Sequence, residues 1–560
     1  MNKKWELYEE NPEKINNLVN KFGIPELIAK VLVDRDITNE EDVKVFLNPT
    51  RNDFHDPFLM PDMEVAVTEI LKAMEEKQKV IIYGDYDVDG ITSITVLKKF
   101  LQEHGLPVDY YIPNRLDEGY GLNKAAIEKI AKDGYQLIIT VDCGISGIEE
   151  VSLANKLGLR VIVTDHHEPG DILPEALAVV DAKRKDNNYP CNVLAGVGVA
   201  FKVIQALSIK LGLDEKEYLK YLDIVCIGTI SDIVPLIDEN RVIAKLGLKL
   251  VEQTRNVGLK ALIKASGYKN IDSNMVSFGI APRINACGRM GFEQEAAKLF
   301  LTDNVTNATA ITSRLNKYNQ ERQAIEKTIY EEAIKKLESE QDENSIVLCS
   351  KGWHHGVIGI VASKLTEMYF KPCLLLCEED GEAKGSGRSI PGFDLHEALC
   401  RSSENLEKYG GHGMAVGLTL KMDKLESFKK QFRQIVDEAN IGEIEQVILI
   451  DKQVELKDIN FETIEKIKLL EPFGEGNKMP LFMCKNLKID SIRALSEGKH
   501  LKLTLKDGNQ ILSAIGFNMG ALANEYLIDD KVDVVGYLEI NEFNGNSHVQ
   551  MNLRDIRRSY

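Results

Sequence analysis

The sequence lacks several features that would place it outside the ordinary folded proteins. No apolar run approaches the roughly 18 residues that a membrane-spanning helix needs. The N-terminal segment MNKKWELYEENPEK has no hydrophobic stretch of the kind found in a secretory signal. Sixteen Pro and 41 Gly among 560 residues are too few for a fibrous or disordered chain. We therefore expect a folded protein without a membrane segment.

Cysteine is sparse, and its spacing gives no framework. The chain has nine cysteines, an odd number, and no pair forms a C-x-x-C motif. The nearest pair, Cys373 and Cys377, flanks an apolar run typical of a strand. A disulfide framework and a zinc ribbon are both disfavoured, so we expect a protein of the reducing cytoplasm.

The chain also lacks an excess of positive charge. It carries 69 Lys and Arg against 87 Asp and Glu, for a formal net charge of -18. This balance argues against a protein that coats polyanions indiscriminately. A nucleic-acid enzyme remains open, because a groove can be locally basic while clustered active-site carboxylates add negative charge.

The hydrophobic pattern predicts several domains, because 560 residues exceed one domain of roughly 100–200 residues. From about residue 64, short apolar strands such as KVIIYG alternate with helices such as ITSITVLKKFLQEHG. This alternation indicates βαβ units and a mainly parallel sheet, whose ligands gather at the carboxyl ends of the strands. The predicted fold class is thus α/β, in five parts: a helical lead-in (1–65), a parallel-sheet domain (66–300), a connector helix (301–342), a second α/β domain (343–440) and a β-rich barrel of the OB type (441–560).

Three carboxylates alternate in the segment GDYDVDG, directly after the predicted strand KVIIY. In isolation, D-x-D-x-D-G is similar to an EF-hand calcium loop. The twelfth position of such a loop would be Val96, where a bidentate Glu is needed, and a strand precedes the segment instead of a helix. Because like charges so close together repel, Asp85, Asp87 and Asp89 predict a metal site of another kind, with a solvated turn as the alternative.

Three more apolar runs that we interpret as strands are followed by Asp or His. LIITVDCG ends in Asp142, RVIVTDHH ends in Asp165, His166 and His167, and Asp232 follows DIVCIGTIS. One such acid is usually a helix cap, but four consecutive sites are not easily assigned to capping. The ends of parallel strands converge at one edge, and these groups are too many for one ion. We therefore expect two ions, which can promote in-line phosphoryl displacement.

The ligand types indicate which metal is held. Carboxylates with a minority of imidazole suit Mn²⁺, whereas sites made only of oxygen favour Mg²⁺ or Ca²⁺. We expect two Mn²⁺ ions, with Mg²⁺ as the alternative. A buried core histidine is the alternative for a single His, and it fits HisHis after a strand-end Asp poorly.

These segments resemble a known family. VIIYGDYDVDG, TVDCG, TDHHEPG and GTISDIVPL together are similar to the DHH phosphoesterase superfamily, which takes its name from the motif in TDHH. Further segments narrow the resemblance to the RecJ family of bacterial single-strand exonucleases, namely GIPELIAKVLVDRDITN, FHDPFLMPDM, PNRLDEGYGL, APRINACGRM, GWHHGVIGIVASKL, GSGRSIPGFDL, YGGHGMAVG and LEPFGEGN.

The resemblance implies a Mn²⁺- or Mg²⁺-dependent 5′→3′ exonuclease that acts on single-stranded DNA in recombination and repair. It implies a DHH catalytic domain at 66–300, a DHH-associated domain at 343–440 and a nucleic-acid-binding OB domain at 441–560. The implied metal ligands are Asp87, Asp89, Asp142, His166 and Asp232. The implied catalytic groups are Asp85, Asp165, His166 and His167.

Small residues, arginines and imidazoles predict where the DNA strand binds. Loops rich in glycine let backbone N–H groups approach a phosphate, and Arg adds bidentate contacts. An aromatic–imidazole segment can stack on a base or sugar. A plain turn, a half-buried aromatic beside surface imidazoles and a surface Arg without a role are the respective alternatives. The predicted substrate-binding residues are Arg115, Arg283, Arg289, His354, His355, Ser386, Arg388, Gly411 and His412.

Two other functions compete with the exonuclease. One is a phosphodiesterase of the DHH superfamily that acts on short oligonucleotides or cyclic dinucleotides, although such an enzyme needs no OB-like domain. The other is a non-catalytic scaffold, which would be free to lose the acids that this chain keeps. The resemblance also implies a single-strand-binding protein and a RecQ-type helicase as partners, and we expect a monomer.

Overall fold

A computed structural model describes residues 3–115, 118–339, 344–543 and 546–559, in two compact units. The first unit comprises residues 1–54, 233–246 and 447–560, and the second comprises residues 55–232 and 247–446. Two chain segments far apart in sequence thus join a short internal segment to build the first unit. Among the described residues, no helix combines the length and apolarity required to span a membrane.

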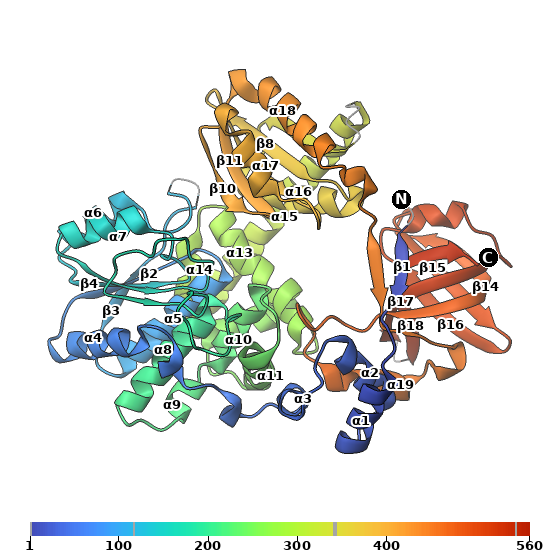
Figure 1. Ribbon diagram of the computed structural model, residues 1–560, viewed down its shortest axis with the longest axis horizontal. Coiled ribbons are helices and arrows are strands. Elements are labelled where there is room, and N and C mark those ends of the chain that lie inside the picture. Colours follow the sequence, from blue (N-terminus) through green and yellow to red (C-terminus); the bar gives the residue numbers. More distant parts are fainter. Residues whose placement is uncertain (1–2, 116–117, 340–343, 544–545, 560) are drawn as a thin grey trace. The chain divides into compact units, whose positions relative to one another are not determined.

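A five-stranded sheet in the second unit confirms the predicted parallel topology (Figure 1). Every neighbouring pair of strands runs parallel. The order is β3-β2-β4-β5-β6, with β2 at Val80–Gly84, β3 at Val108–Tyr111, β4 at Leu137–Val141, β5 at Arg160–Thr164 and β6 at Ala178–Val180.

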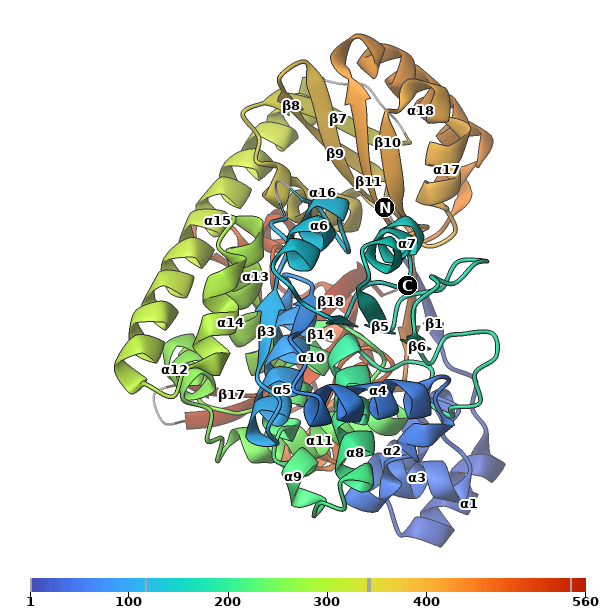
Figure 2. The same ribbon diagram turned by 90° about the vertical axis from the view of Figure 1, so that its left-hand side faces the viewer.

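Helices cover both faces of this sheet (Figures 1 and 2). Side chains two positions apart, such as Ile81 and Tyr83, pack with α6 and α7, and the alternate positions face α4, α5 and α8. Because helices cover both faces of the sheet, a ligand can reach the sheet only at the ends of its strands. The covering helices are α4 (Met63–Glu75), α5 (Val88–Glu103), α6 (Lys124–Lys132), α7 (Ile148–Lys156) and α8 (Gly196–Lys210).

The prediction of a strand before Asp232 is wrong, because residues Leu222–Ser231 form the helix α10. Nearly every residue of α10 is buried. A short helix that is apolar on all sides has no amphipathic period, so its sequence cannot be told from that of a buried strand. The neighbouring helices are α9 (Lys216–Leu219), α11 (Asp238–Val251), α12 (Val257–Ser266), α13 (Ala281–Arg289) and α14 (Glu293–Leu301).

The predicted connector is the single helix α15, Val305–Ser339. Its first half buries Ala308, Ile311 and Leu315 and packs against α12, α13 and α14. Its second half buries Ile329 and Ala333 against α16. One continuous helix thus carries the chain from the parallel-sheet domain to the second α/β domain.

The second α/β domain has a mixed five-stranded sheet of order β10-β11-β9-β8-β7. Only β7 and β8 pair in parallel, and the remaining pairs are antiparallel. Its strands are β7 (Ile346–Lys351), β8 (Cys373–Glu379), β9 (Glu382–Arg388), β10 (Lys408–His412) and β11 (Ala415–Lys421). Its helices are α16 (His355–Tyr369), α17 (Leu395–Arg401) and α18 (Leu425–Glu438).

The N-terminal segment belongs to the first unit, together with the C-terminal barrel. It forms the expected helices, and Asn39 caps α3 by accepting a hydrogen bond from the Asp42 backbone N–H at 2.8 Å. It also forms an unpredicted strand β1 (Lys4–Leu7), which pairs in parallel with β12 (Val447–Ile450). The helices of this unit are α1 (Pro12–Phe22), α2 (Glu26–Asp34), α3 (Glu40–Leu47) and α19 (Phe461–Ile467).

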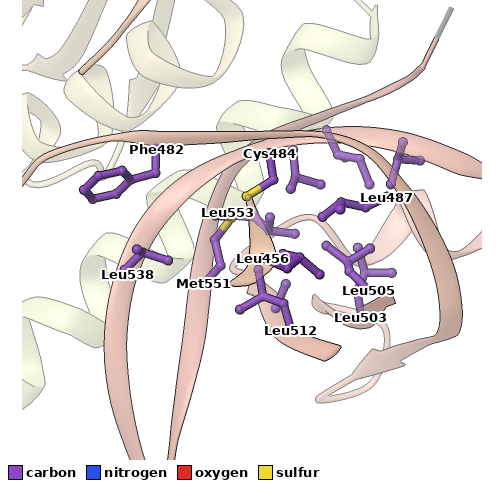
Figure 3. Packing of buried hydrophobic residues seen from close by; sticks show 14 of the residues in the cluster. Leu456, Phe482, Cys484, Leu487, Leu503, Leu505, Leu512, Leu538, Met551 and Leu553 are labelled. Carbon is purple, nitrogen blue, oxygen red and sulfur yellow. The ribbon is translucent and has the colours of Figure 1, made fainter. Parts of the chain in front are cut away.

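The C-terminal strands form a barrel, as predicted. Their order is β13-β14-β15-β16-β18-β17, and a further pairing of β14 with β17 closes the sheet. Leucines such as Leu503 and Leu505 belong to its buried core, as do Phe482 and Met551 (Figure 3). The strands are β13 (Lys452–Gln453), β14 (Phe482–Leu495), β15 (His500–Asp507), β16 (Gln510–Gly516), β17 (Lys531–Phe543) and β18 (Asn546–Arg558).

Candidate metal centre and substrate pocket

Three of the predicted acids lie at the same level of the parallel sheet. Gly84, Val141 and Thr164 are in register as the last residues of β2, β4 and β5. The next residue in each case is an acid: Asp85, Asp142 or Asp165. All three acids are buried. Strand register alone therefore brings these acids to one edge.

The loop after β2 brings two further acids to this edge. Asp87 caps α5 and accepts a hydrogen bond from the Gly90 backbone N–H at 3.1 Å. Asp89 accepts hydrogen bonds from the backbone N–H groups of Gly196 at 2.6 Å and Val197 at 2.8 Å, in the first turn of α8. A Cβ atom at Gly90 would lie 2.4 Å from the Asp85 carbonyl oxygen, so this tight turn requires glycine.

Asp232 reaches the same cluster from the end of α10 and not from a strand. Its Oδ2 lies 3.7 Å from Nε2 of His166. The sequence located the residue correctly and assigned the wrong element to it. The packing of α10 against α5 and α8 provides the position instead.

His166 lies at the centre of the cluster. Its Nε2 is 3.1 Å from Oδ1 of Asp142 and 3.7 Å from Oδ2 of Asp89. This nitrogen is buried and makes no hydrogen bond with the described residues. Burial, followed by the charge of His167, lowers the pKa of His166 to about 3. The imidazole is therefore neutral near pH 7, which is the form that binds a metal.

The side chains form overlapping groups that fit metal ions. The ligand atoms within each group lie within 4.8 Å of one another. Asp142 and His166 each belong to two groups, and Oδ1 of Asp85 is a buried oxygen without a hydrogen bond among the described residues. Carboxylate oxygens with one or two imidazoles suit Mn²⁺ or Mg²⁺. The groups are Asp85–Asp87–Asp142, Asp89–His166–Asp232 and Asp142–His166–His167.

The electrostatics of the cluster also favour a cation. Burial, followed by the charge of Asp87, raises the pKa of Asp89 to about 7. Burial, followed by the charge of Asp89, raises the pKa of Asp232 to about 9. Burial also raises the pKa of Asp85 and Asp142 well above the usual range. Divalent cations would relieve the repulsion that these carboxylates exert on one another.

Asp165 has a different role from the other acids. Its Oδ1 accepts a hydrogen bond from the backbone N–H of His166 at 2.8 Å and lies 2.7 Å from Nδ1 of His167. Its Oδ2 accepts a hydrogen bond from the Ile145 backbone N–H at 2.9 Å. Asp165 is in none of the three metal groups. It therefore orients the His pair and leaves the metal-facing positions to other acids.

The Asp165–His167 pair shifts both pKa values in favour of the ion pair. Although burial opposes ionisation of each, the hydrogen bond between them lowers the pKa of Asp165 and raises that of His167. The His167 ring therefore keeps its proton to a higher pH than an ordinary imidazole. The pKa values of these adjacent histidines are thus shifted in opposite directions.

Tyr120 is a site residue that the sequence analysis missed. Its hydroxyl lies 3.2 Å from both ring nitrogens of His167 and donates a hydrogen bond to the Asp142 carbonyl oxygen at 3.3 Å. The segment PNRLDEGYGL contained the signal, but only Arg115 was selected from it. Asn285 was also missed, and its Oδ1 accepts a hydrogen bond from the Val88 backbone N–H at 3.2 Å.

Arginine and histidine side chains from four elements lie beside the acids. Arg115 precedes α6, Arg289 ends α13, His354 and His355 begin α16, and Arg388 ends β9. Burial, followed by the charge of Arg115, lowers the pKa of Arg289 to about 9 and lowers that of Arg388. After burial, Arg115 also lowers the pKa of both histidines. These five predicted substrate residues are thus close enough for Arg115 to act on the other four.

This basic group adjoins the metal cluster. The charge of Arg115 lowers the pKa of Asp85, in opposition to burial, and its guanidinium lies 5.0 Å from the centre of the Tyr86 ring. Oγ of Ser386 accepts a hydrogen bond from Nη1 of Arg388 at 3.3 Å. After burial, the charges of Arg388 and His167 lower the pKa of His412. Both domains of the second unit therefore supply residues to one region.

Two of the predicted residues also have contacts or a conformation that the fold itself requires. Arg283 donates hydrogen bonds to Oδ1 of Asn316 at 2.6 Å and to the carbonyl oxygens of Gly279 and Ala265. These bonds engage its guanidinium within the fold. At Gly411, φ is +127° and a Cβ atom would lie 2.3 Å from the Ala415 carbonyl oxygen, so the hairpin itself requires glycine.

Comparison with known families matches the three domains in order. Residues 79–229 match the N-terminal domain of the DHH family, residues 342–438 match the DHHA1 domain, and residues 450–555 match the RecJ OB domain.

Comparison with individual proteins covers almost the whole chain. The single-stranded-DNA-specific exonuclease RecJ of Bacillus subtilis is 39% identical over 99% of this chain and 70% of its own. The crystal structure of RecJ in complex with Mn²⁺ from Thermus thermophilus is similar with a TM-score of 0.86 at 29% identity, over 100% of this chain and 80% of that one. The Mg²⁺ complex from the same organism gives a TM-score of 0.80 at 27% identity, over 100% and 79%.

Proposed function

Because the chain belongs to the RecJ family of single-stranded-DNA-specific exonucleases, we propose that it hydrolyses single-stranded DNA stepwise from the 5′ end with two divalent metal ions. The observation that carries this proposal is the convergence of five acids and two histidines at the carboxyl edge of the parallel sheet. Mn²⁺ is the favoured ion and Mg²⁺ the alternative, since similar proteins bind each.

The residues of the cluster form two sets of ligands, one for each metal ion. Asp85, Asp87 and Asp142 would hold one ion, and Asp89, His166 and Asp232 would hold the other, with Asp142 between the two groups. When bound, two such ions activate a water molecule and stabilise the attacking and leaving oxygens of the phosphodiester.

His167 acts on the substrate side of this cluster. Although burial opposes it, the hydrogen bond with Asp165 raises the pKa of this ring. In its protonated form, which the raised pKa favours, the ring can donate a hydrogen bond to a non-bridging phosphate oxygen and stabilise the charge that develops there. Tyr120 fixes the edge of the same ring.

The basic group would recognise the terminal 5′-phosphate. Arg115, Arg289 and Arg388 supply charge beside Asp85, and Ser386 adds a hydroxyl. Arginine binds phosphate oxygens through charge-assisted, bidentate hydrogen bonds. A phosphate held there would present the adjoining phosphodiester to the metal cluster, which gives 5′→3′ polarity. We propose His354, His355, Gly411 and His412 as further contacts to the strand.

The barrel and the partners complete the proposal. The OB domain would hold the strand beyond the active site through stacking and positive charge. A single-strand-binding protein and a RecQ-type helicase would supply the strand, and the enzyme would act as a monomer in the cytoplasm, in recombination and repair.

A digestion time course tests this proposal. The substrate is a single strand of several tens of nucleotides, 5′-phosphorylated and labelled near the 3′ end, with Mn²⁺. A 5′-hydroxyl strand, a duplex and a dinucleotide serve in parallel. We expect progressive shortening of the phosphorylated single strand from its 5′ end. Hydrolysis of the dinucleotide alone would instead assign the chain to the enzymes that act on short oligonucleotides.

A further inference from the structure

The chain leaves the second unit at a residue of the metal cluster. Asp232 is the last residue of the second unit before residues 233–246, which belong to the first unit. The helix α10 holds Asp232 from one side, through the hydrogen bond from the Asp232 backbone N–H to the Gly228 carbonyl oxygen at 2.9 Å. The residues on the C-terminal side of Asp232 must hold it from the other side.

The three residues after Asp232 have little conformational freedom. Ile233 has a φ of +62°, which is rare and strained for a β-branched residue. Val234 precedes a proline and is thereby restricted to extended conformations. The ring of Pro235 fixes its own φ. The segment is therefore a short, stiff link. The position of its C-terminal end, at Leu236, determines the direction in which the chain leaves Asp232.

A glycine-rich loop holds that far end. The Leu236 backbone N–H donates a hydrogen bond to the Glu475 carbonyl oxygen at 2.8 Å. A Cβ atom at Gly474 would lie 2.6 Å from Cδ1 of Leu236, and one at Gly476 would lie 3.0 Å from Cβ of Pro235. The two glycines therefore permit a contact with the link that no larger residue would allow. This loop is Leu470–Asn477, the LEPFGEGN segment for which the proposed function gives no role.

Two buried side chains make the loop rigid. The guanidinium of Arg241 is fully buried and donates hydrogen bonds to the carbonyl oxygens of Leu470 at 3.1 Å and Glu471 at 3.2 Å. Asn477 is also fully buried, and its side-chain amide donates to the carbonyl oxygens of Leu470 and Pro472 at 2.8 Å each. Arg241 belongs to the segment C-terminal to Asp232, so the loop and the segment are locked together at two places.

We infer that the Leu470–Asn477 loop is a positioning element for the metal centre. It holds residues 235–241, and through the stiff link it holds the Asp232 carboxylate toward the neighbouring acids that would otherwise repel it. Gly474 and Arg241 are thus positioning residues for a site to which neither contributes a ligand. The inference rests on the proposed role of Asp232 as a metal ligand.

A matched pair of glycine variants tests the inference. In Gly474→Ala the new Cβ would press on Leu236, at 2.6 Å from Cδ1 and 3.1 Å from Cγ. In Gly516→Ala, in the barrel of the same unit, it would press on Met519 with similar severity, at 2.7 Å from Sδ and 3.1 Å from Cβ. The control therefore matches the chemical change and the local crowding, and it differs because its contact, Met519, lies outside the link that follows Asp232.

Mn²⁺ binding to the metal-free full-length protein is measured by titration calorimetry and electron paramagnetic resonance. We expect Gly474→Ala to lower the affinity for one of the two bound ions about ten-fold. This is the lower end of the loss seen when a residue that supports a metal ligand is removed. Gly516→Ala should leave both ions at wild-type affinity. In an Asp232→Asn background, Gly474→Ala should cause no additional loss.

Other outcomes would overturn the inference. These are equal effects of the two glycine variants on Mn²⁺ affinity, no effect of Gly474→Ala, or an undiminished effect of Gly474→Ala in the Asp232→Asn background. If Gly474→Ala does not fold, Arg241→Lys replaces it, with the same expectation. A different result would contradict the proposed function: wild-type protein that binds two Mn²⁺ ions but does not cleave DNA.

Discussion

At the scale of single residues, two adjacent histidines show how burial and one neighbour divide chemical roles. The His166 ring faces three carboxylates that a metal would share with it, and burial keeps it neutral. The His167 ring faces Asp165, whose hydrogen bond raises the pKa of the ring against the effect of burial. The sequence placed both in the site, and the resemblance assigned only His166 to the metal, but the opposite pKa shifts could not be predicted because they depend on which carboxylate each ring meets.

Loss of a metal ligand should remove the chemistry and spare the binding of DNA. We expect Asp142→Ala or His166→Ala to lower the rate of strand cleavage by more than about a hundred-fold, since even the outer partners of metal ligands contribute about 10–100-fold. Strand affinity, measured by fluorescence anisotropy, should change little because many contacts share it. Near-normal turnover in both variants would contradict the assignment of the metal centre.

Loss of Arg388 should affect recognition of the strand end. Hydrogen bonds to charged groups contribute about 1.5–3 kcal/mol, so Arg388→Ala should reduce the preference for a 5′-phosphate over a 5′-hydroxyl by about ten- to hundred-fold. Competition between the two substrates measures this preference. Arg401→Ala, an exposed change in the same domain that breaks the Arg401–Glu438 pair, should leave the preference intact.

The thermal stability of Arg388→Ala decides between two roles. A melting temperature close to that of the wild type is expected for a substrate contact. If stability collapsed while the preference for a 5′-phosphate remained, Arg388 would be a structural residue of β9.

At the scale of elements, the sequence was most informative where a pattern is long or has a strict period. The parallel strands were predicted because short apolar runs alternate regularly with helical segments, and the 35-residue helix α15 was predicted because a period of 3.6 residues persists in it. The helix α10 was mistaken for a strand because all its faces are buried. Tyr120 was missed because an exposed loop tyrosine has no periodic signal, and its partners come from other strands.

The helix α15 should fix the basic residues of the second α/β domain relative to the metal cluster. Each inserted residue rotates the rest of a helix by about 100° and advances it by about 1.5 Å. One alanine inserted after Gln320 should therefore turn Ser386 and Arg388 away from Asp85. We expect cleavage to be lost while Mn²⁺ binding persists, because every ligand precedes the insertion.

A control insertion separates this geometric effect from damage to the domain. One alanine inserted after Asp380, in the turn between β8 and β9, lengthens the same domain without changing the phase of α15. It should leave most activity intact. Full activity after the insertion in α15 would show that the helix does not set the distance between pocket and metal cluster.

At the scale of the whole molecule, sequence patterns predicted the order of the domains but not the assembly of the first unit. That unit combines residues 1–54, 233–246 and 447–560. Pairing of β1 with β12 and burial of Arg241 against the loop at 470–472 join segments hundreds of residues apart. No local pattern encodes such partners, so long-range assembly could not be predicted from propensity.

The acid cluster should make the stability of the metal-free protein depend on pH. The pKa values of Asp89, about 7, and Asp232, about 9, lie above those of unfolded carboxyls, so the folded state binds more protons between about pH 4 and pH 9. The free energy of unfolding must then fall as pH rises through this window. The melting temperature with a chelator should accordingly decrease from pH 6 to pH 9, and Mn²⁺ should reduce the decrease.

Asp232→Asn provides the control for this effect, because an amide has no proton to lose. The variant should show a smaller decrease in melting temperature over the same pH range. A melting temperature of the metal-free wild type that rises with pH would contradict the electrostatic description of the cluster.

The most direct measurement is the anomalous diffraction of a crystal grown with Mn²⁺. Two anomalous peaks are predicted at the carboxyl edge of the parallel sheet, separated by about 3.5–4 Å as in other two-metal sites. One should lie among Asp85, Asp87 and Asp142, and the other among Asp89, His166 and Asp232. A single peak, or peaks away from these side chains, would contradict the two-metal account.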